Sequence, residues 1–138
     1  FGGAADTGCL NDTWVFDLST HGWTETTTPT LLPGPGARLE HTMAPLGNGK
    51  VLLLGGGNGG NTDGDVWMFD LTTKWAYINN LPASAAPTAR SLPAMASGDD
   101  DNRKVVFFGG SSINSYFLGD TFVLDQLTKK WTQIIATM

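Results

Sequence analysis

The sequence has little of what several protein classes require. Its 138 residues contain one cysteine, so no intrachain disulfide can form and a disulfide-stapled scaffold is excluded. Its 8 lysines and arginines form no cluster and are outnumbered by 13 acidic residues, which argues against nucleic acid as a partner. The longest apolar run is far shorter than the roughly 20 residues of a membrane helix. We therefore expect no nucleic-acid partner and no membrane insertion.

Motifs of catalytic and metal sites are missing as well. A G-x-G-x-x-G pattern begins at Gly55, but a strand-like segment follows it, so no helix N-terminus would face a pyrophosphate. The two histidines, His21 and His41, lack metal-ligand spacing. Residues 99–101 are aspartates without the glycine and distal glutamate of an EF-hand loop. We predict no catalytic residues, no metal ligands and no cofactor.

The sequence does contain a repeat, with a period of about 53 residues. Glycine pairs begin at Gly2, Gly55 and Gly109. The similar segments that begin at Asp12, Asp65 and Asp120 keep the same interval, and each is followed by a tryptophan: Trp23, Trp75 and Trp131. A Pro-x-Ala-Arg segment occurs twice and ends at Arg38 and Arg90. Several features in one register indicate repeated structural units rather than chance.

Each repeat consists of short apolar segments, β-branched or aromatic, separated by turn residues, which predicts strands rather than helices. The predicted strands are Thr42–Leu46, Lys50–Gly55, Asp65–Leu71 and Trp75–Ile78, and then Leu92–Ala96, Lys104–Gly109, Asp120–Asp125 and Trp131–Ile135. The segments 51–54 and 105–108 are apolar throughout, so we expect each small sheet to be buried on both faces. Repeated sheets of this kind are typical of a radial stack of blades.

These residues resemble the kelch motif: a glycine pair that ends a strand, an aromatic-rich strand, and a tryptophan about twenty residues after the glycines. The resemblance covers essentially the whole chain. It implies an all-β fold, a kelch-type β-propeller segment of about two and a half four-stranded antiparallel blades. We expect a partial blade with outer strands and a connection at 1–36, and complete blades at 37–86 and 87–138. Bare end faces would then require further kelch blades, from the same chain or from copies of it.

Proteins with kelch propellers have unrelated activities, so the sequence predicts one favoured function and leaves two alternatives open. The favoured prediction is a non-catalytic protein-interaction module, part of a larger propeller. One alternative is a structural subunit of a fibre or large assembly. Another is the non-catalytic portion of a propeller oxidase, since galactose oxidase, a copper radical enzyme, has a kelch-like propeller. Tyr77, Tyr116 and Cys9 provide residue types found at its copper site, but in no recognisable order.

Because strand direction alternates within a blade, the loops after the glycine pairs and the connections between blades should emerge on one face, here called the long-loop face. Long loops on a rigid scaffold often carry recognition, so we expect the protein partner there. The candidate contacts are Asn58, Asn61, Asp63, Asn114, Ser115 and Tyr116.

Arg38 and Arg90 are also candidate binding residues, because each precedes an inner strand. The resemblance implies that an arginine here faces the channel mouth, where its guanidinium suits carboxylates or phosphorylated ligands. The alternative is a structural arginine that bonds backbone carbonyls of the next blade.

Overall fold

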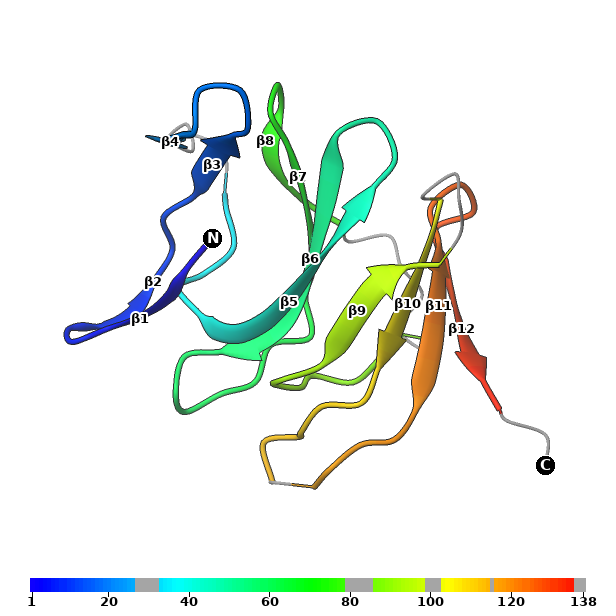
Figure 1. Ribbon diagram of the computed structural model, residues 1–138. Helices are drawn as coiled ribbons and strands as arrows, with labels where there is room; N and C mark the ends of the chain where they lie inside the picture. The colour runs from blue at the N-terminus through cyan, green and yellow to red at the C-terminus, as the bar shows by residue number, and fades with distance from the viewer. Residues whose placement is uncertain (27–32, 79–85, 99–102, 115, 136–138) are drawn as a thin grey trace.

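The computed structural model describes residues 1–26, 33–78, 86–98, 103–114 and 116–135. These residues form β-strands in four antiparallel sheets (Figure 1). The strands are β1 (Gly3–Ala5), β2 (Gly8–Leu10), β3 (Trp14–Asp17), β4 (Gly22–Glu25), β5 (Leu39–Leu46) and β6 (Lys50–Gly57), then β7 (Val66–Asp70), β8 (Lys74–Tyr77), β9 (Ala94–Ser97), β10 (Lys104–Phe108), β11 (Thr121–Asp125) and β12 (Lys130–Ile134). The described part of the chain has no helix that could cross a membrane.

Two of the sheets are complete four-stranded blades, in the orders β5-β6-β7-β8 and β9-β10-β11-β12. The predicted all-β fold and the partial propeller are confirmed. The strand ends differ from the prediction mainly at the inner strands, since β5 begins three residues early at Leu39 and β9 begins late at Ala94. The late start of β9 follows from Leu92, whose φ of 55° is left-handed, and from Pro93, which has no N–H for the ladder.

The first unit contains the outer pair β3–β4 and a small hairpin, β1–β2, that the sequence analysis did not predict. Its position after the glycine pair corresponds to the loop after β6, where Gly57 and Thr62 form an isolated bridge. In the complete blades, the equivalents of β3 pair on both sides, whereas β3 pairs only with β4. One edge of β3 therefore has no strand partner among the described residues.

Apolar side chains pack between neighbouring units rather than within one sheet. Leu52 and Leu54 belong to a cluster that the middle blade shares with the third blade, and Leu53 belongs to a second cluster that reaches Phe1 and Val15 of the first unit. The middle blade is thus buried on both faces, as its apolar run predicts.

The third blade is covered on only one of its faces, and it thus has one of the bare end faces that the sequence analysis expected. Val105 and Phe107 are fully buried, but Val106 is partly exposed and Phe108 is half-exposed. No described segment packs on the outer face of this sheet, so the alternate residues of β10 remain in contact with solvent.

The repeated tryptophans show how each unit depends on the one before it. Trp75 is buried against Phe1, and its Nε1 donates a hydrogen bond to Oγ1 of Thr13 in the first unit, 2.9 Å away. Trp131 is equally buried, but the position equivalent to Thr13 is Val66, which has no hydroxyl, and Nε1 of Trp131 has no hydrogen-bond partner among the residues that the structure describes. Trp23 is 64% exposed because no described blade covers it.

The units lie side by side, with the short hairpins at the top of Figure 1 and the longer loops at the bottom. The hairpins β5–β6, β7–β8 and β11–β12 are at one end of the blades, and the loops that follow β6 and β10 are at the other. This arrangement defines the long-loop face on which the candidate residues were expected.

Candidate functional site

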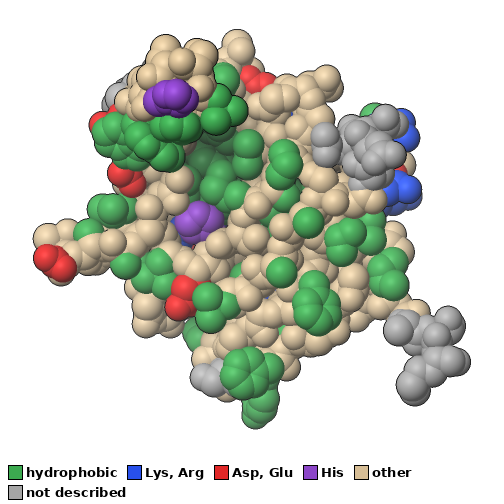
Figure 2. All heavy atoms as spheres, viewed as in Figure 1, with side chains coloured by type: hydrophobic (Ala, Val, Ile, Leu, Met, Phe, Trp, Pro, Cys, Tyr) green, Lys and Arg blue, Asp and Glu red, His purple; other side chains and the backbone are tan. Residues whose placement is uncertain are grey.

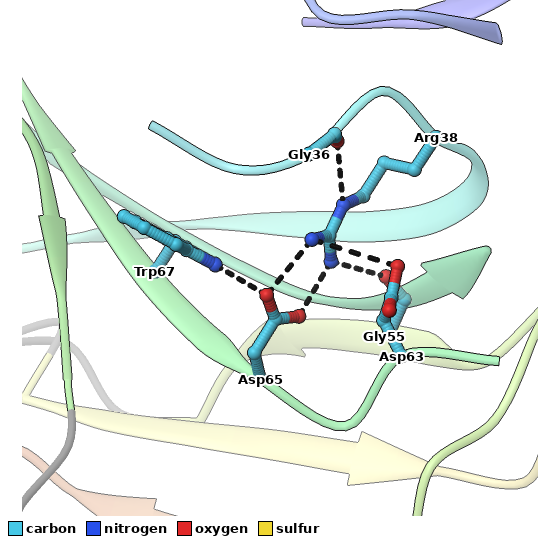
Figure 3. A network of polar contacts seen from close by, with 6 residues as sticks. All are labelled: Gly36, Arg38, Gly55, Asp63, Asp65 and Trp67. Atoms are coloured by element: carbon cyan, nitrogen blue, oxygen red, sulfur yellow. Dashed lines mark hydrogen bonds and ion pairs between the residues drawn. The ribbon is translucent and has the colours of Figure 1, made fainter. Parts of the chain in front are cut away.

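The base of the long-loop face contains a buried arginine in each complete blade. Arg38 precedes β5, and Asp65 accepts two hydrogen bonds from its guanidinium at 2.6 and 2.8 Å (Figure 3). The Arg38 Nε donates to the carbonyl oxygen of Gly36, and Nη1 also donates to that of Gly55. The second Nη lies 3.5 Å from a carboxylate oxygen of Asp63. The Arg38 guanidinium thus makes four hydrogen bonds within the protein, and the Asp63 carboxylate lies at ion-pair distance from it.

Arg90 repeats this arrangement in the third blade. It makes a two-point ion pair with Asp120 and donates to the carbonyl of Gly109 and to both the carbonyl and the hydroxyl of Thr88. The guanidinium also lies over the rings of two buried phenylalanines, at 5.4 and 5.7 Å. Arg90 is fully buried.

Each arginine therefore joins the two ends of a long loop. Arg38 contacts Gly55, where the loop leaves β6, and Asp65, where the chain returns to β7. Arg90 joins Gly109 to Asp120 in the same way. The structural alternative for these residues placed the acceptor carbonyls in the next blade, but they lie in the arginine's own blade. These buried ion pairs hold the loop ends at a fixed separation.

The aspartates of these pairs are held in the charged form. Burial alone would raise the pKa of Asp65, but hydrogen bonds from Arg38 and Trp67, together with the Arg38 charge, outweigh it and lower that pKa. Hydrogen bonding from Arg90 lowers the pKa of Asp120 despite its partial burial. The ion pairs are thus intact at neutral pH.

The backbone of each arginine contacts the preceding unit. The Arg38 carbonyl accepts a hydrogen bond from the N–H of Gly3, and the Arg90 carbonyl accepts one from Gly56. A Cβ on Gly55, whose φ is 75°, would lie 2.7 Å from the Arg90 carbonyl oxygen. The first glycine of the pair is therefore required by a close approach of the next blade and by its left-handed backbone.

Two hollows lie on the long-loop face above these ion pairs. One, of about 410 Å³, lies between the middle and third blades and is lined by Glu40, Asn61, Leu92 and Ile113, among others. The other, of about 650 Å³, lies between the first unit and the middle blade, and Cys9, Asn58 and Asp63 line it together with Arg38. Gly60 lines both, so the loop after β6 separates them.

The structure thus brings several of the predicted binding residues to this face. Asn58 and Asn61 are exposed in the hollows, and Asp63 is partly exposed. Asn114 and Tyr116 are exposed on the loop after β10, although they line neither hollow. Ser115 lies outside the described residues. Arg38 and Arg90 lie beneath the surface, and their guanidinium N–H groups donate hydrogen bonds to acceptors within the protein.

Of the residues that line the hollow between the complete blades, sequence reasoning predicted Asn61 as a contact and missed the others, among them Glu40, Leu92 and Ile113. Glu40 and Leu92 each follow a repeated arginine by two positions, and both have left-handed backbones, with φ of 59° and 55°. Their position relative to the arginines is readable in the sequence. Their backbone geometry is not, because neither residue type favours positive φ.

Residues considered for metal or radical chemistry lie apart. Within the described ranges, no group of three or more His, Cys, Asp or Glu side chains could hold a metal ion. Cys9 is in β2 and Tyr116 is in the loop after β10. Tyr77 is in β8, where it packs on Trp67 of β7. Burial lowers the pKa of His41, and the charge of Arg38 acts in the same direction. The aspartates at 99–101 lie outside the described residues.

A repeated blade with a glycine pair, a buried arginine–aspartate ion pair and a buried tryptophan on the outer strand defines a β-propeller of kelch type. The chain matches the KLHDC2/KLHL20/DRC7 Kelch-repeats domain over residues 1–138 and belongs to the kelch-repeat family. Kelch-repeat domains are generally protein-interaction modules.

Among curated proteins, the chain is 32% identical to Adagio-like protein 1 of Oryza sativa subsp. japonica over 133 residues, which is 93% of this chain and 20% of the relative. It is 36% identical to the tRNA wybutosine-synthesizing protein 4 of Candida albicans over 90 residues, 65% of this chain and 12% of the relative. It is 25% identical to the Rab9 effector protein with kelch motifs of Xenopus laevis, over 99% of this chain and 36% of the relative. The chain thus spans a minor part of each of these relatives.

Proposed function

We propose that this chain is a non-catalytic protein-interaction segment of a larger kelch propeller and that it binds its partner through the long-loop face. The observation that carries the proposal is the pair of hollows, lined by exposed loop residues, above loops whose ends are tied by buried ion pairs. Such ties keep a binding surface in one conformation and so reduce the entropy lost on association. In this proposal, Arg38 and Arg90 position the loops that contact the partner.

The relatives support an interaction role without naming a partner. One of them is named as an effector of Rab9, and another is named for tRNA wybutosine synthesis. The chain is thus similar to part of a protein named as an effector and to part of one named for an enzymatic process. We assign no catalysis to these residues, because their polar side chains on the long-loop face include no nucleophile paired with a base and no ligand cluster among the described residues.

A photo-crosslinking amino acid tests the proposal in the full-length protein. Placed in cells at Asn61 or Asn114, it should give covalent adducts with a partner protein. Placed at Thr72, in the β7–β8 hairpin on the opposite face, it should give none. Adducts from Thr72 alone, or equal adducts from both faces, would show that the long-loop face is not the binding surface.

The second predicted partner is further β-sheet, and two incompletely covered apolar regions support it. Apolar side chains of β3 and the middle blade surround a hollow of about 290 Å³, which is lined by Trp14, Phe16 and Phe69, among others. Figure 2 shows apolar side chains gathered around a hollow at the upper left, in the region of β3 in Figure 1. This apolar hollow and the bare face of the third blade favour burial by additional blades. We retain the division of the chain into units at 1–36, 37–86 and 87–138 as part of this proposal.

A further inference from the structure

The cationic side chains of this chain are divided between its two faces. The sequence has 8 lysines and arginines, and the two buried ones, Arg38 and Arg90, use their donors within the protein. The other cationic residues adjoin the short hairpins on the opposite face: Lys50, Lys74, Arg103, Lys104, Lys129 and Lys130. Figure 2 shows lysine and arginine side chains at the upper right, near the hairpin ends of the third blade.

The long-loop face has a carboxylate in each of its hollows instead. Glu40 lines the hollow between the complete blades and is exposed, and its carboxylate has no hydrogen-bond or ion-pair partner among the described residues. Asp63 lines the other hollow with a side chain 37% exposed. The one cation near it, Arg38, already forms a two-point ion pair with Asp65. Neither hollow is lined by any other lysine or arginine of the described chain.

Bulky apolar side chains are exposed beside these carboxylates. Leu92 is 66% exposed and Ile113 is 57% exposed, and both line the same hollow as Glu40. Phe117, on the same loop as Ile113, is 92% exposed and is bridged to Ser111. The left-handed backbone of Leu92 is held by a hydrogen bond from its N–H to the carbonyl of Glu40. Apolar side chains grouped on a surface in this way mark an interaction site.

We propose that the long-loop face binds a segment of a partner protein in which lysine or arginine side chains stand next to bulky apolar ones. The cationic groups pair with Glu40 and Asp63, and an apolar side chain packs on Leu92 and Ile113. Glu40 and Asp63 repel an acidic segment, because the arginines below the hollows are paired with other aspartates and do not offset this charge. This inference rests on the proposed function and adds the chemistry of the partner to it.

The test uses the full-length protein and two fluorescent peptide pools with the same leucine and tyrosine positions. One pool carries lysine and arginine at the remaining positions, and the other carries glutamate and aspartate. We expect the basic pool to bind and the acidic pool not to bind, with affinity falling as ionic strength rises from about 0.05 to 0.5 M. Glu40→Gln should weaken binding of the basic pool about two- to fivefold.

Two further variants separate this effect from general changes. Glu25→Gln removes the same charge from β4, outside both hollows, and should leave the affinity unchanged. Leu92→Asn should weaken binding while keeping the backbone, since asparagine tolerates positive φ.

The proposal fails if the acidic pool binds as well as the basic pool, if neither pool binds, or if Glu25→Gln weakens binding as much as Glu40→Gln. Such a result leaves the proposed function standing as long as crosslinks still form from Asn61. Loss of those crosslinks would refute the proposed function itself.

Discussion

The ion pair of Arg90 and Asp120 offers a direct test of what holds the long loops in place. Arg90→Met keeps much of the side-chain volume but removes the cation, which leaves the partly buried Asp120 and the carbonyl of Gly109 without their donors. Breaking a buried pair by removal of one partner costs about 3–5 kcal/mol. Asp120 is 24% exposed, so water recovers part of its solvation and the lower end of that range is expected.

The assay is urea unfolding of the full-length protein, followed by tryptophan fluorescence. Lys130→Met is the matched control, because it removes an exposed cation from the start of β12. It should shift the free energy of unfolding by less than about 0.5 kcal/mol. Arg90→Lys should lower the free energy of unfolding by an amount between those of Arg90→Met and Lys130→Met, because lysine keeps the charge but cannot form the two-point ion pair.

The effect should also depend on pH in a defined direction. The folded protein lowers the pKa of Asp120 from its ordinary value of 3.8, mainly through hydrogen bonds from Arg90. The pair therefore contributes its full stability above pH 3.8 and loses it as the pH falls through the lower folded pKa. The difference in the free energy of unfolding between the native protein and Arg90→Met should therefore shrink as the pH falls below 3.8. A difference below about 1 kcal/mol at neutral pH, or one independent of pH, would refute the role given to the pair.

Three further predictions follow from the packing. Trp75→Ala should destabilise the protein by about 3–5 kcal/mol in the same urea assay, because this side chain is buried against the first unit and donates to Thr13; a cost below about 1 kcal/mol would contradict the unit-to-unit packing. Gly55→Ala should cost about 2 kcal/mol or more because of its positive φ and the Arg90 carbonyl, and Gly60→Ala, in open space, should be tolerated. Residues 1–138 expressed alone should self-associate in light scattering, and a soluble, cooperatively unfolding monomer would disprove the need for further blades.

Much of the fold was predictable from the sequence because its signals are local. Each turn residue lies within a few residues of the apolar segment beside it, and the recurrence of these segments at one interval predicted the two complete blades. The positions of the loops followed from strand alternation, so Asn58 and Asn61 were expected on the face where they lie. The repeated arginines were recognised, but their partners were not.

Those partners depend on contacts between distant residues. Asp65 lies 27 residues after Arg38, and Asp120 lies 30 after Arg90, so no short-range pattern joins them. The same holds for the left-handed backbones of Glu40 and Leu92, which only the surrounding sheet imposes.

The sequence by itself determined the repeat, the strands and the face on which the long loops emerge, since each depends on the order of neighbouring residues. The tertiary structure decided what each repeated residue contacts. Trp75 and Trp131 occupy the same place in their repeats and are both buried, yet Nε1 of Trp75 donates to Thr13 of the preceding unit, whereas Nε1 of Trp131 has no hydrogen-bond partner among the described residues. Such a hydrogen bond depends on the contact between units, and a repeat describes only the unit.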